Sequence, residues 1–149
     1  MNVAKTKTLF FYGTLRDEAV REAVIGTQGK KMNLIDGYLK GYKLFKVKNA
    51  NYPLILRDLS SKSRINGLIA KDLDKQIIRK LDMFEGENYS RTKASAFRAC
   101  DNIEINLEIY MPKKCLQFTE EWIFEDWCKF QKKFFFENDF DAKGVRSPN

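Results

Sequence analysis

Residues 103–110 alternate strictly between apolar and polar side chains, which is the clearest structural signal in the chain. The apolar positions are Ile103, Ile105, Leu107 and Ile109, and the positions between them are Glu104, Asn106, Glu108 and Tyr110. Because successive side chains of a strand point to opposite faces, this pattern predicts a β-strand with one buried face. A second strand is predicted over residues 92–99, with Asp101-Asn102 as the turn of a hairpin.

Four further segments, each bent or bounded by glycine or proline, also have strand patterns. They are residues 8–12, residues 35–47 with bends at Gly37 and Gly41, residues 52–57 beginning near Pro53, and residues 65–70 broken by Gly67. The first of them is an almost continuous apolar run, which is typical of a strand buried on both faces.

Two helices are predicted before the hairpin. The first covers residues 16–25, with Thr14 as its N-cap and Gly26 at its end. The second follows Asp72 as its N-cap and carries one apolar stripe, formed by Leu73, Ile77, Leu81 and Phe84.

A third, aromatic helix is predicted over residues 119–136, with Thr119 as its N-cap. Its stripe is Ile123, Trp127, Phe130 and Phe134, and the surplus aromatics are Trp122, Phe124, Phe135 and Phe136. Two interpretations stay open: the helix packs into the sheet, or the surplus aromatics form a homodimer surface. The tail after Phe140 is expected to fray.

Composition narrows the class of protein. The 149 residues predict one domain over 1–149, and 44% apolar content with 12 phenylalanines predicts a packed core. No apolar run is long enough to span a membrane, and the N-terminus lacks a signal-peptide core, so we expect a cytoplasmic protein with no membrane partner. The net charge of +7 is dispersed over many lysines, so no specific nucleic-acid binding is expected.

The chain contains no histidine, which excludes Ser-His and Cys-His nucleophilic arrangements and the commonest zinc ligand. Its cysteines, Cys100, Cys115 and Cys128, are widely spaced and lack metal-ligand spacing. We therefore expect neither a metal site nor a nucleophilic cysteine. Any acid/base catalyst must then be a carboxylate, a lysine, a tyrosine or a cysteine.

The stretch 81–91 combines the end of the second helix, a glycine turn and the start of a strand. Glu85 is the last residue before Gly86 and follows the apolar Phe84. A carboxylate in apolar surroundings has its charged form disfavoured, as a general acid/base near neutral pH requires. A solvated glutamate at a helix end is the alternative, and Glu87 is the competing carboxylate.

A second candidate site follows the first strand, where Tyr12-Gly13-Thr14-Leu15 leads into the first helix. Backbone N–H groups at such a junction can bind an anion. A plain strand-to-helix turn is the alternative.

Together, Leu9 to Leu15 and Leu81 to Gly86 with Tyr89 and Arg91 resemble the gamma-glutamylcyclotransferase-like family, nearest its gamma-glutamylamine cyclotransferase branch. Tyr52-Pro53-Leu54 resembles a Tyr-Pro pair that many members carry between the two motifs. Tyr110 falls where members have a tyrosine in the last core strand. The resemblance covers about residues 8–112 and leaves the aromatic helix without a counterpart.

The resemblance implies an α+β fold, a small mixed β-barrel flanked by helices, and an activity without metal or cofactor. In that activity the α-amine of a γ-glutamyl group attacks its own γ-carbonyl, releasing 5-oxoproline and an amine. By position, Glu85 resembles the catalytic acid/base. The residues that resemble or complete the substrate-binding set are Tyr12, Gly13, Thr14, Leu15, Tyr52, Tyr89 and Tyr110.

The sequence leaves alternatives open for two residues, for the leaving amine and for the function. Strand parity places Tyr110 on the polar side opposite Ile109, and Arg91 fits either a structural ion pair or a ligand contact. The leaving amine is open among simple amines, peptides, aminoglycosides and ε-lysine compounds. A non-catalytic binding or regulatory protein on the same fold is the alternative function, and it predicts a filled or open cavity.

Overall fold

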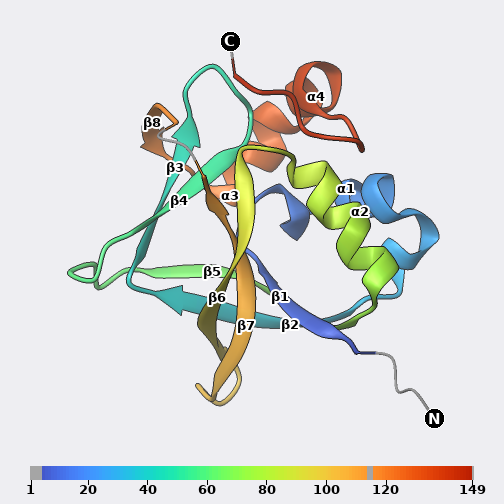
Figure 1. Ribbon diagram of the computed structural model, residues 1–149. Helices are drawn as coiled ribbons and strands as arrows, with labels where there is room; N and C mark the ends of the chain where they lie inside the picture. Colours follow the sequence, from blue (N-terminus) through green and yellow to red (C-terminus); the bar gives the residue numbers. More distant parts are fainter. Residues whose placement is uncertain (1–4, 114–115, 149) are drawn as a thin grey trace.

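The computed structural model describes residues 5–113 and 116–148, and its largest unit is a closed β-barrel (Figure 1). Around the barrel the strand order is β1 (Lys7–Phe11), β5 (Arg64–Leu73), β2 (Asn33–Lys40), β6 (Tyr89–Arg98) and β7 (Glu104–Pro112). Neighbouring strands pair antiparallel, except that β1 and β7 close the barrel in parallel at Leu9 and Glu108. The predicted α+β class with a small barrel flanked by helices is confirmed.

A second sheet and two groups of helices surround the barrel (Figure 1). The sheet has the order β4 (Pro53–Arg57), β3 (Tyr42–Val47) and β8 (Phe118–Glu121). Helices α1 (Glu18–Ile25) and α2 (Lys75–Glu85) lie together on one side, and short 3-10 turns cover Thr14–Arg16 and Gly26–Lys30. The C-terminal helical segment consists of α3 (Phe124–Asp126), π-helical Trp127–Gln131, α4 (Lys132–Phe134) and π-helical Phe135–Asp139.

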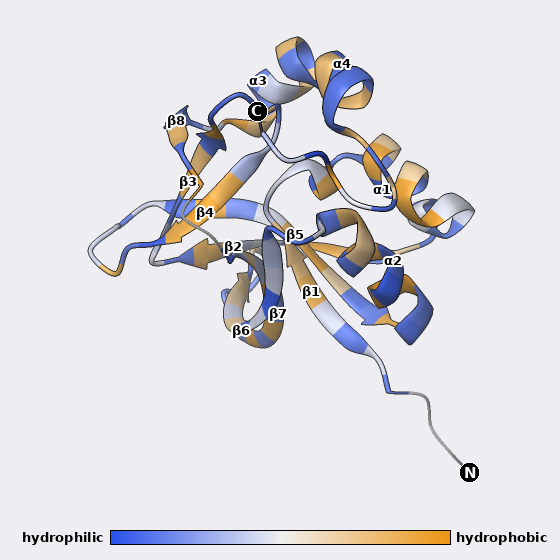
Figure 2. Ribbon diagram, turned by 45° about the horizontal axis from the view of Figure 1, so that its top comes forward, coloured by the Kyte–Doolittle hydropathy of each residue, from blue (hydrophilic) through white to orange (hydrophobic). Residues whose placement is uncertain are grey.

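The core gathers apolar side chains from the barrel, from β3 and β4, from α1 and α2, and from the π-helical turns of the C-terminal helical segment. Phe10, Phe84, Trp127 and Phe135, from β1, α2 and the C-terminal helical segment, are all almost fully buried. Figure 2 shows hydrophobic residues along β1 and β4. Along α2 it shows both hydrophobic and hydrophilic residues, as expected for a helix with one buried face. The β6–β7 hairpin turns at the predicted Asp101-Asn102, and Pro53 begins an edge strand as predicted.

The predicted starts of the first two helices are wrong. Asp17, not Thr14, caps α1, because its side chain accepts a hydrogen bond from the Val20 N–H. Asp74, not Asp72, caps α2 by accepting from the Ile77 N–H at 2.9 Å. The predicted stripe is corrected accordingly: Leu73 belongs to β5, and the buried face of α2 is Ile78, Leu81 and Phe84.

The predicted aromatic helix over 119–136 also needs correction. Thr119 lies in β8, which pairs with β3, and the helical segment runs from Phe124 to Asp139. Trp127 of the predicted stripe is buried, whereas Ile123, which precedes the helical segment, is 47% exposed. Phe130 is 69% exposed and Phe134 48%, because the π-helical turns alter the 3.6-residue period. Trp122 and Phe135, two of the surplus aromatics, are buried in the core instead.

The tail after Phe140 is not frayed, since several hydrogen bonds hold it against the fold. The Val145 N–H donates to the Phe84 carbonyl at 2.7 Å, and the Arg146 N–H donates to the Asp139 carbonyl at 2.9 Å. The prediction of a homodimer stays a prediction.

Of the three cysteines, Cys115 lies outside the described residues, and Cys100 and Cys128 are free thiols. Over residues 5–113 and 116–148, no helix has both the length and the apolar character needed to cross a bilayer. The cytoplasmic location stays a prediction.

Gly67 was expected to break its strand, but β5 continues through it. A Cβ atom there would lie 2.3 Å from the Phe11 carbonyl oxygen and 2.6 Å from Cζ of Phe10, so only glycine lets β1 lie this close to β5.

We expect Gly67→Ala to destabilise the protein by about 1–3 kcal/mol, because the added methyl group must push β1 outward. Urea unfolding measures the change. Asn66→Ala, at the exposed neighbouring position of β5, is the control and should stay within about 0.5 kcal/mol of the wild type. Equal effects of the two substitutions would contradict the tight contact between β1 and β5.

Candidate active site

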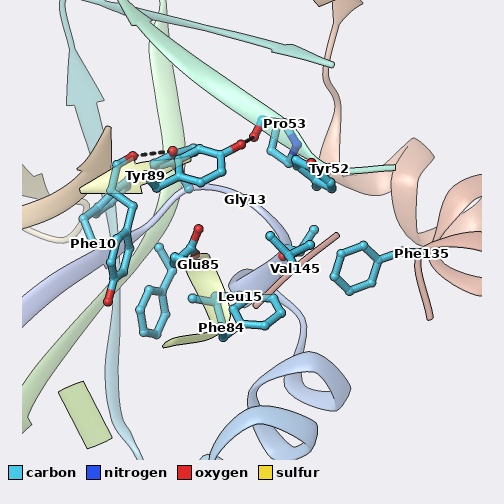
Figure 3. Close-up of a pocket in the computed structure, with 14 residues that line it drawn as sticks. Phe10, Gly13, Leu15, Tyr52, Pro53, Phe84, Glu85, Tyr89, Phe135 and Val145 are labelled. Atoms are coloured by element: carbon cyan, nitrogen blue, oxygen red, sulfur yellow. Dashed lines mark hydrogen bonds between the residues drawn. The ribbon is translucent and has the colours of Figure 1, made fainter. Parts of the chain in front are cut away.

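A narrow pocket of about 440 Å³, including space open to solvent, lies where β1, α2, β4 and the C-terminal segment (residues 124–148) meet (Figure 3). All eight residues predicted for the site line it, although they come from distant parts of the sequence. They are Tyr12, Gly13, Thr14, Leu15, Tyr52, Glu85, Tyr89 and Tyr110. The structure therefore brings the two sequence motifs to one cavity.

The loop after β1 turns tightly at the pocket wall. The Arg16 N–H donates to the Gly13 carbonyl at 3.0 Å and starts the 3-10 turn. The N–H groups of Thr14 and Leu15 precede this first bond, so the turn itself gives them no acceptor. A Cβ on Gly13 would lie 2.9 Å from Cγ of Pro53, so the loop requires glycine where it packs against the Tyr52-Pro53 pair.

Glu85 is the last residue of α2, and the buried stripe of that helix fixes its position. Gly86 ends the helix with φ of 74°, a left-handed conformation that favours glycine, and its N–H donates to the Asp82 carbonyl. Glu85 then points into the pocket, whereas Glu87 is exposed and does not line it (Figure 3). Of the two carboxylates considered, only Glu85 faces the cavity.

The Glu85 carboxyl is enclosed by protein, although the residue as a whole keeps some exposure at the pocket opening. Burial raises its pKa from the ordinary 4.5 to about 8, and the negative charge of Asp82 adds to the rise. Within the described part of the chain no donor forms a hydrogen bond to this carboxyl, so no protein hydrogen bond stabilises its charged form. Its oxygens are free to exchange a proton with a ligand.

Four tyrosine hydroxyls surround this carboxyl, yet each donates its proton elsewhere. Tyr12 donates to the Tyr110 carbonyl at 2.5 Å, and Tyr89 donates to the Pro53 carbonyl at 2.9 Å. Tyr52 donates to a backbone carbonyl of the C-terminal segment at 2.9 Å, and Tyr110 donates to a carboxylate of α2 at 2.8 Å.

These four tyrosines are held neutral by their surroundings. Burial is the main cause that raises the pKa of each hydroxyl, and the charge of Glu85 raises it further in all four. Because their protons are already donated, the hydroxyl oxygens can offer only lone pairs to a ligand.

Tyr110 is buried despite its place on the polar side of β7, at the end of the strand where its hydroxyl meets Asp82 of α2. Its hydroxyl donates to Asp82 Oδ1, which also accepts from Arg91 Nε at 2.8 Å. Arg91 in turn pairs with Glu108 at 3.1 Å. Of the two interpretations for Arg91, the structure therefore supports the structural ion pair.

Sequence reasoning missed six residues of the pocket wall: Phe10, Phe11, Pro53, Phe84, Phe135 and Val145. Phe11, Pro53 and Phe84 adjoin predicted site residues in the sequence, and Phe10 lies two residues before Tyr12, so this proximity could have found them. Phe135 and Val145 come from the C-terminal segment, where no sequence signal points to the pocket. In the described residues no group of three His, Cys, Asp or Glu side chains is arranged to hold a metal ion.

A family model described as gamma-glutamyl cyclotransferase, AIG2-like, matches residues 9–129. AIG2-like protein A of Arabidopsis thaliana is 26% identical over 131 residues, which are 87% of this chain and 76% of that protein. AIG2-like protein C from the same organism is 28% identical over 129 residues, covering 85% of this chain and 72% of that protein.

Solved structures share the fold. A solution structure from Arabidopsis thaliana has a TM-score of 0.67 at 23% identity and covers 91% of this chain and 89% of that one. A structure named gamma-glutamyl cyclotransferase has a TM-score of 0.61 at 13% identity, covering 97% and 90%. Because the family model spans most of the sequence and the architecture agrees, this chain belongs to the gamma-glutamyl cyclotransferase, AIG2-like family.

Proposed function

We propose that this protein is a cyclotransferase that converts a γ-glutamyl amine or peptide to 5-oxoproline and a free amine. Glu85 is the general acid/base in this proposal. The observation that carries it is the enclosed Glu85 carboxyl, with a pKa raised to about 8, in the same pocket as the Tyr12–Leu15 loop. Family membership supports the reaction class, a transferase or lyase type of cyclisation.

The proposed reaction needs one proton carrier. Ionised Glu85 takes a proton from the α-ammonium group, and the resulting amine nitrogen attacks the γ-carbonyl carbon to close a five-membered ring. Glu85 returns this proton to the leaving nitrogen as its bond to the carbon breaks. The ring nitrogen then gives up its second proton, which Glu85 passes to the departing amine, so that a lactam N–H and an ammonium ion remain. The two products together contain all the atoms of the substrate, so neither water nor a cofactor is consumed. Orientation within one molecule supplies much of the rate enhancement.

The wall of the pocket offers partners for both charges of the γ-glutamyl head. The N–H groups of Thr14 and Leu15 suit its carboxylate or the developing oxyanion, since neither N–H has an acceptor within the turn. The lone pairs of the tyrosine hydroxyls and the Glu85 carboxylate suit its ammonium group, which only donates hydrogen bonds. This division of donors and acceptors supports an amino-acid head in the pocket.

A non-catalytic binding or regulatory protein is the alternative function. The exposed aromatic side chains of the C-terminal helical segment favour it, because Phe130 and Phe134 have no role in the pocket. However, a binding protein has no need for a carboxyl held near neutrality without a hydrogen-bond partner. The pocket therefore favours the enzyme.

We expect Glu85→Gln to lower 5-oxoproline release by about two to four orders of magnitude, because glutamine keeps the shape but cannot carry the proton. Substrate binding should persist, since the Tyr12–Leu15 loop is untouched. Steady-state kinetics of 5-oxoproline release from γ-glutamyl amides, with calorimetric binding to the variant, measures both.

Glu87→Gln is the matched control, because Glu87 is exposed and does not line the pocket. It should change turnover little. A folded Glu85→Gln protein with nearly wild-type turnover would remove Glu85 from the mechanism.

The pH dependence of kcat/KM should have an ascending limb with an apparent pKa near 8, because Glu85 must be ionised to accept the first proton. It should fall again at higher pH, where the free substrate loses the ammonium proton that the leaving amine needs. Initial rates at low substrate concentration between pH 6 and 10 give this profile.

Asp82→Asn should shift that ascending limb to lower pH, because the charge of Asp82 helps to raise the pKa of Glu85. Glu108→Gln is the control, since Glu108 also pairs with Arg91 but does not act on Glu85. An ascending limb that stays in place in the Asp82 variant would contradict electrostatic coupling between the two carboxyls.

The pH dependence of the free energy of unfolding should also reflect the burial of the Glu85 carboxyl. A folded-state pKa above the unfolded value means that the contribution of Glu85 to stability is complete below about pH 4.5 and is lost as pH rises through 8. Relative to wild type, Glu85→Gln should therefore gain about 1.4 kcal/mol per pH unit over this window. Urea unfolding of both proteins at pH 5, 6.5 and 8 tests this expectation. A difference in unfolding free energy that does not change with pH would mean that the Glu85 carboxyl is exposed to water.

A further inference from the structure

The pocket opening is formed by few side chains. Of the fourteen residues on its wall, Gly13, Glu85 and Val145 are partly exposed, and the other described lining residues are buried. Gly13 has no side chain, and Glu85 is the proposed proton carrier. Val145 is therefore the one side chain at the opening whose only contribution is its shape.

Val145 is held in place through the backbone of its segment. Its N–H donates at 2.7 Å to the carbonyl of Phe84, the residue before the proposed catalytic carboxylate. The next carbonyl, that of Arg146, accepts from the Tyr52 hydroxyl at 2.9 Å. Both partners line the pocket, so the segment is fastened to the pocket wall on either side of the Val145 side chain.

Three further hydrogen bonds connect the same segment to the rest of the fold. The Arg146 N–H donates to the Asp139 carbonyl at 2.9 Å, and Asp139 Oδ2 accepts from the Asn51 N–H at 2.6 Å. Beyond Val145, Ser147 Oγ accepts from Asn88 Nδ2 at 3.0 Å. The side chain at position 145 therefore has a defined place, as a residue that selects between substrates requires.

The proposed reaction determines what lies beside Val145. Glu85 must come within hydrogen-bond reach of the leaving nitrogen in order to protonate it. In the proposed binding mode the γ-glutamyl head lies against the N–H groups of the buried Thr14 and Leu15, so the leaving group extends toward the opening. Figure 3 draws Val145 between Glu85 and Phe135 in this view, and all three line the pocket. The first carbon of the leaving amine therefore passes the Val145 methyl groups.

We propose that Val145 is a specificity-determining residue, which limits branching at the carbon bonded to the leaving nitrogen. The substrate class is then a γ-glutamyl amide whose leaving amine is unbranched and apolar at that carbon. This inference rests on the proposed cyclotransferase function. It concerns a residue beyond positions 9–129, the part of the chain that the family model matches.

The test compares two substrates that differ by one methyl group, γ-glutamyl ethylamide and γ-glutamyl isopropylamide. The measured quantity is the ratio of their kcat/KM values for 5-oxoproline release, isopropylamide over ethylamide. Val145→Ala should raise this ratio about tenfold, and Val145→Leu should lower it, because one methylene in an apolar contact changes discrimination by about 10- to 200-fold. The ratio does not depend on the fraction of enzyme that is folded.

Lys143→Ala is the matched control, an exposed position in the same segment, and its ratio should equal that of the wild type. If either Val145 variant is too unstable to assay, the other still predicts a shift of defined sign. Active variants whose ratio is unchanged would overturn the role of Val145 and leave the cyclotransferase proposal intact. A wild-type protein that releases 5-oxoproline from neither amide, nor from other γ-glutamyl compounds, would overturn the proposed function and this inference with it.

Discussion

The site depends on a carboxyl group that protein encloses without hydrogen bonding. Burying a carboxylate is costly unless donors replace the lost water, and here four nearby hydroxyls all donate to other acceptors. The proton therefore stays on Glu85 to a pKa of about 8. A hydrogen bond from even one of these tyrosines to Glu85 would stabilise the charged form of the Glu85 carboxyl and lower its pKa.

The same hydroxyls also hold the walls together. Tyr12 connects the end of β1 to β7, Tyr89 connects β6 to β4, and Tyr110 connects β7 to α2. Each bond spans from 28 to 98 residues of sequence, so the pocket forms only when the barrel and its covering elements are assembled. The same tyrosines thus fix the shape of the site and leave Glu85 without a tyrosine donor, which links the raised pKa of Glu85 to the intact fold.

Sequence patterns within a few residues predicted those parts of the candidate site whose structure depends on neighbouring residues in the chain. Glu85 could be placed because the apolar stripe of α2 ends at Phe84 and Gly86 ends the helix. Predictions failed where a distant partner decides the structure. Thr119 has the character of a helix cap, yet pairing with β3, more than seventy residues earlier, holds it in a strand. The π-helical turns after Trp127 likewise shift which aromatics are buried, and no periodicity of 3.6 can reveal this.

The C-terminal segment shows why its place in the pocket could not be seen in the sequence. Its bonds to the pocket wall use the N–H of Val145 and the carbonyl of Arg146, groups that every residue other than proline possesses. The segment would therefore keep its position whatever apolar side chain stood at 145. The backbone therefore determines where this part of the wall lies, and the side chain at position 145 determines its shape. A single substitution there can change the shape of the opening while Glu85 and the tyrosines keep their positions.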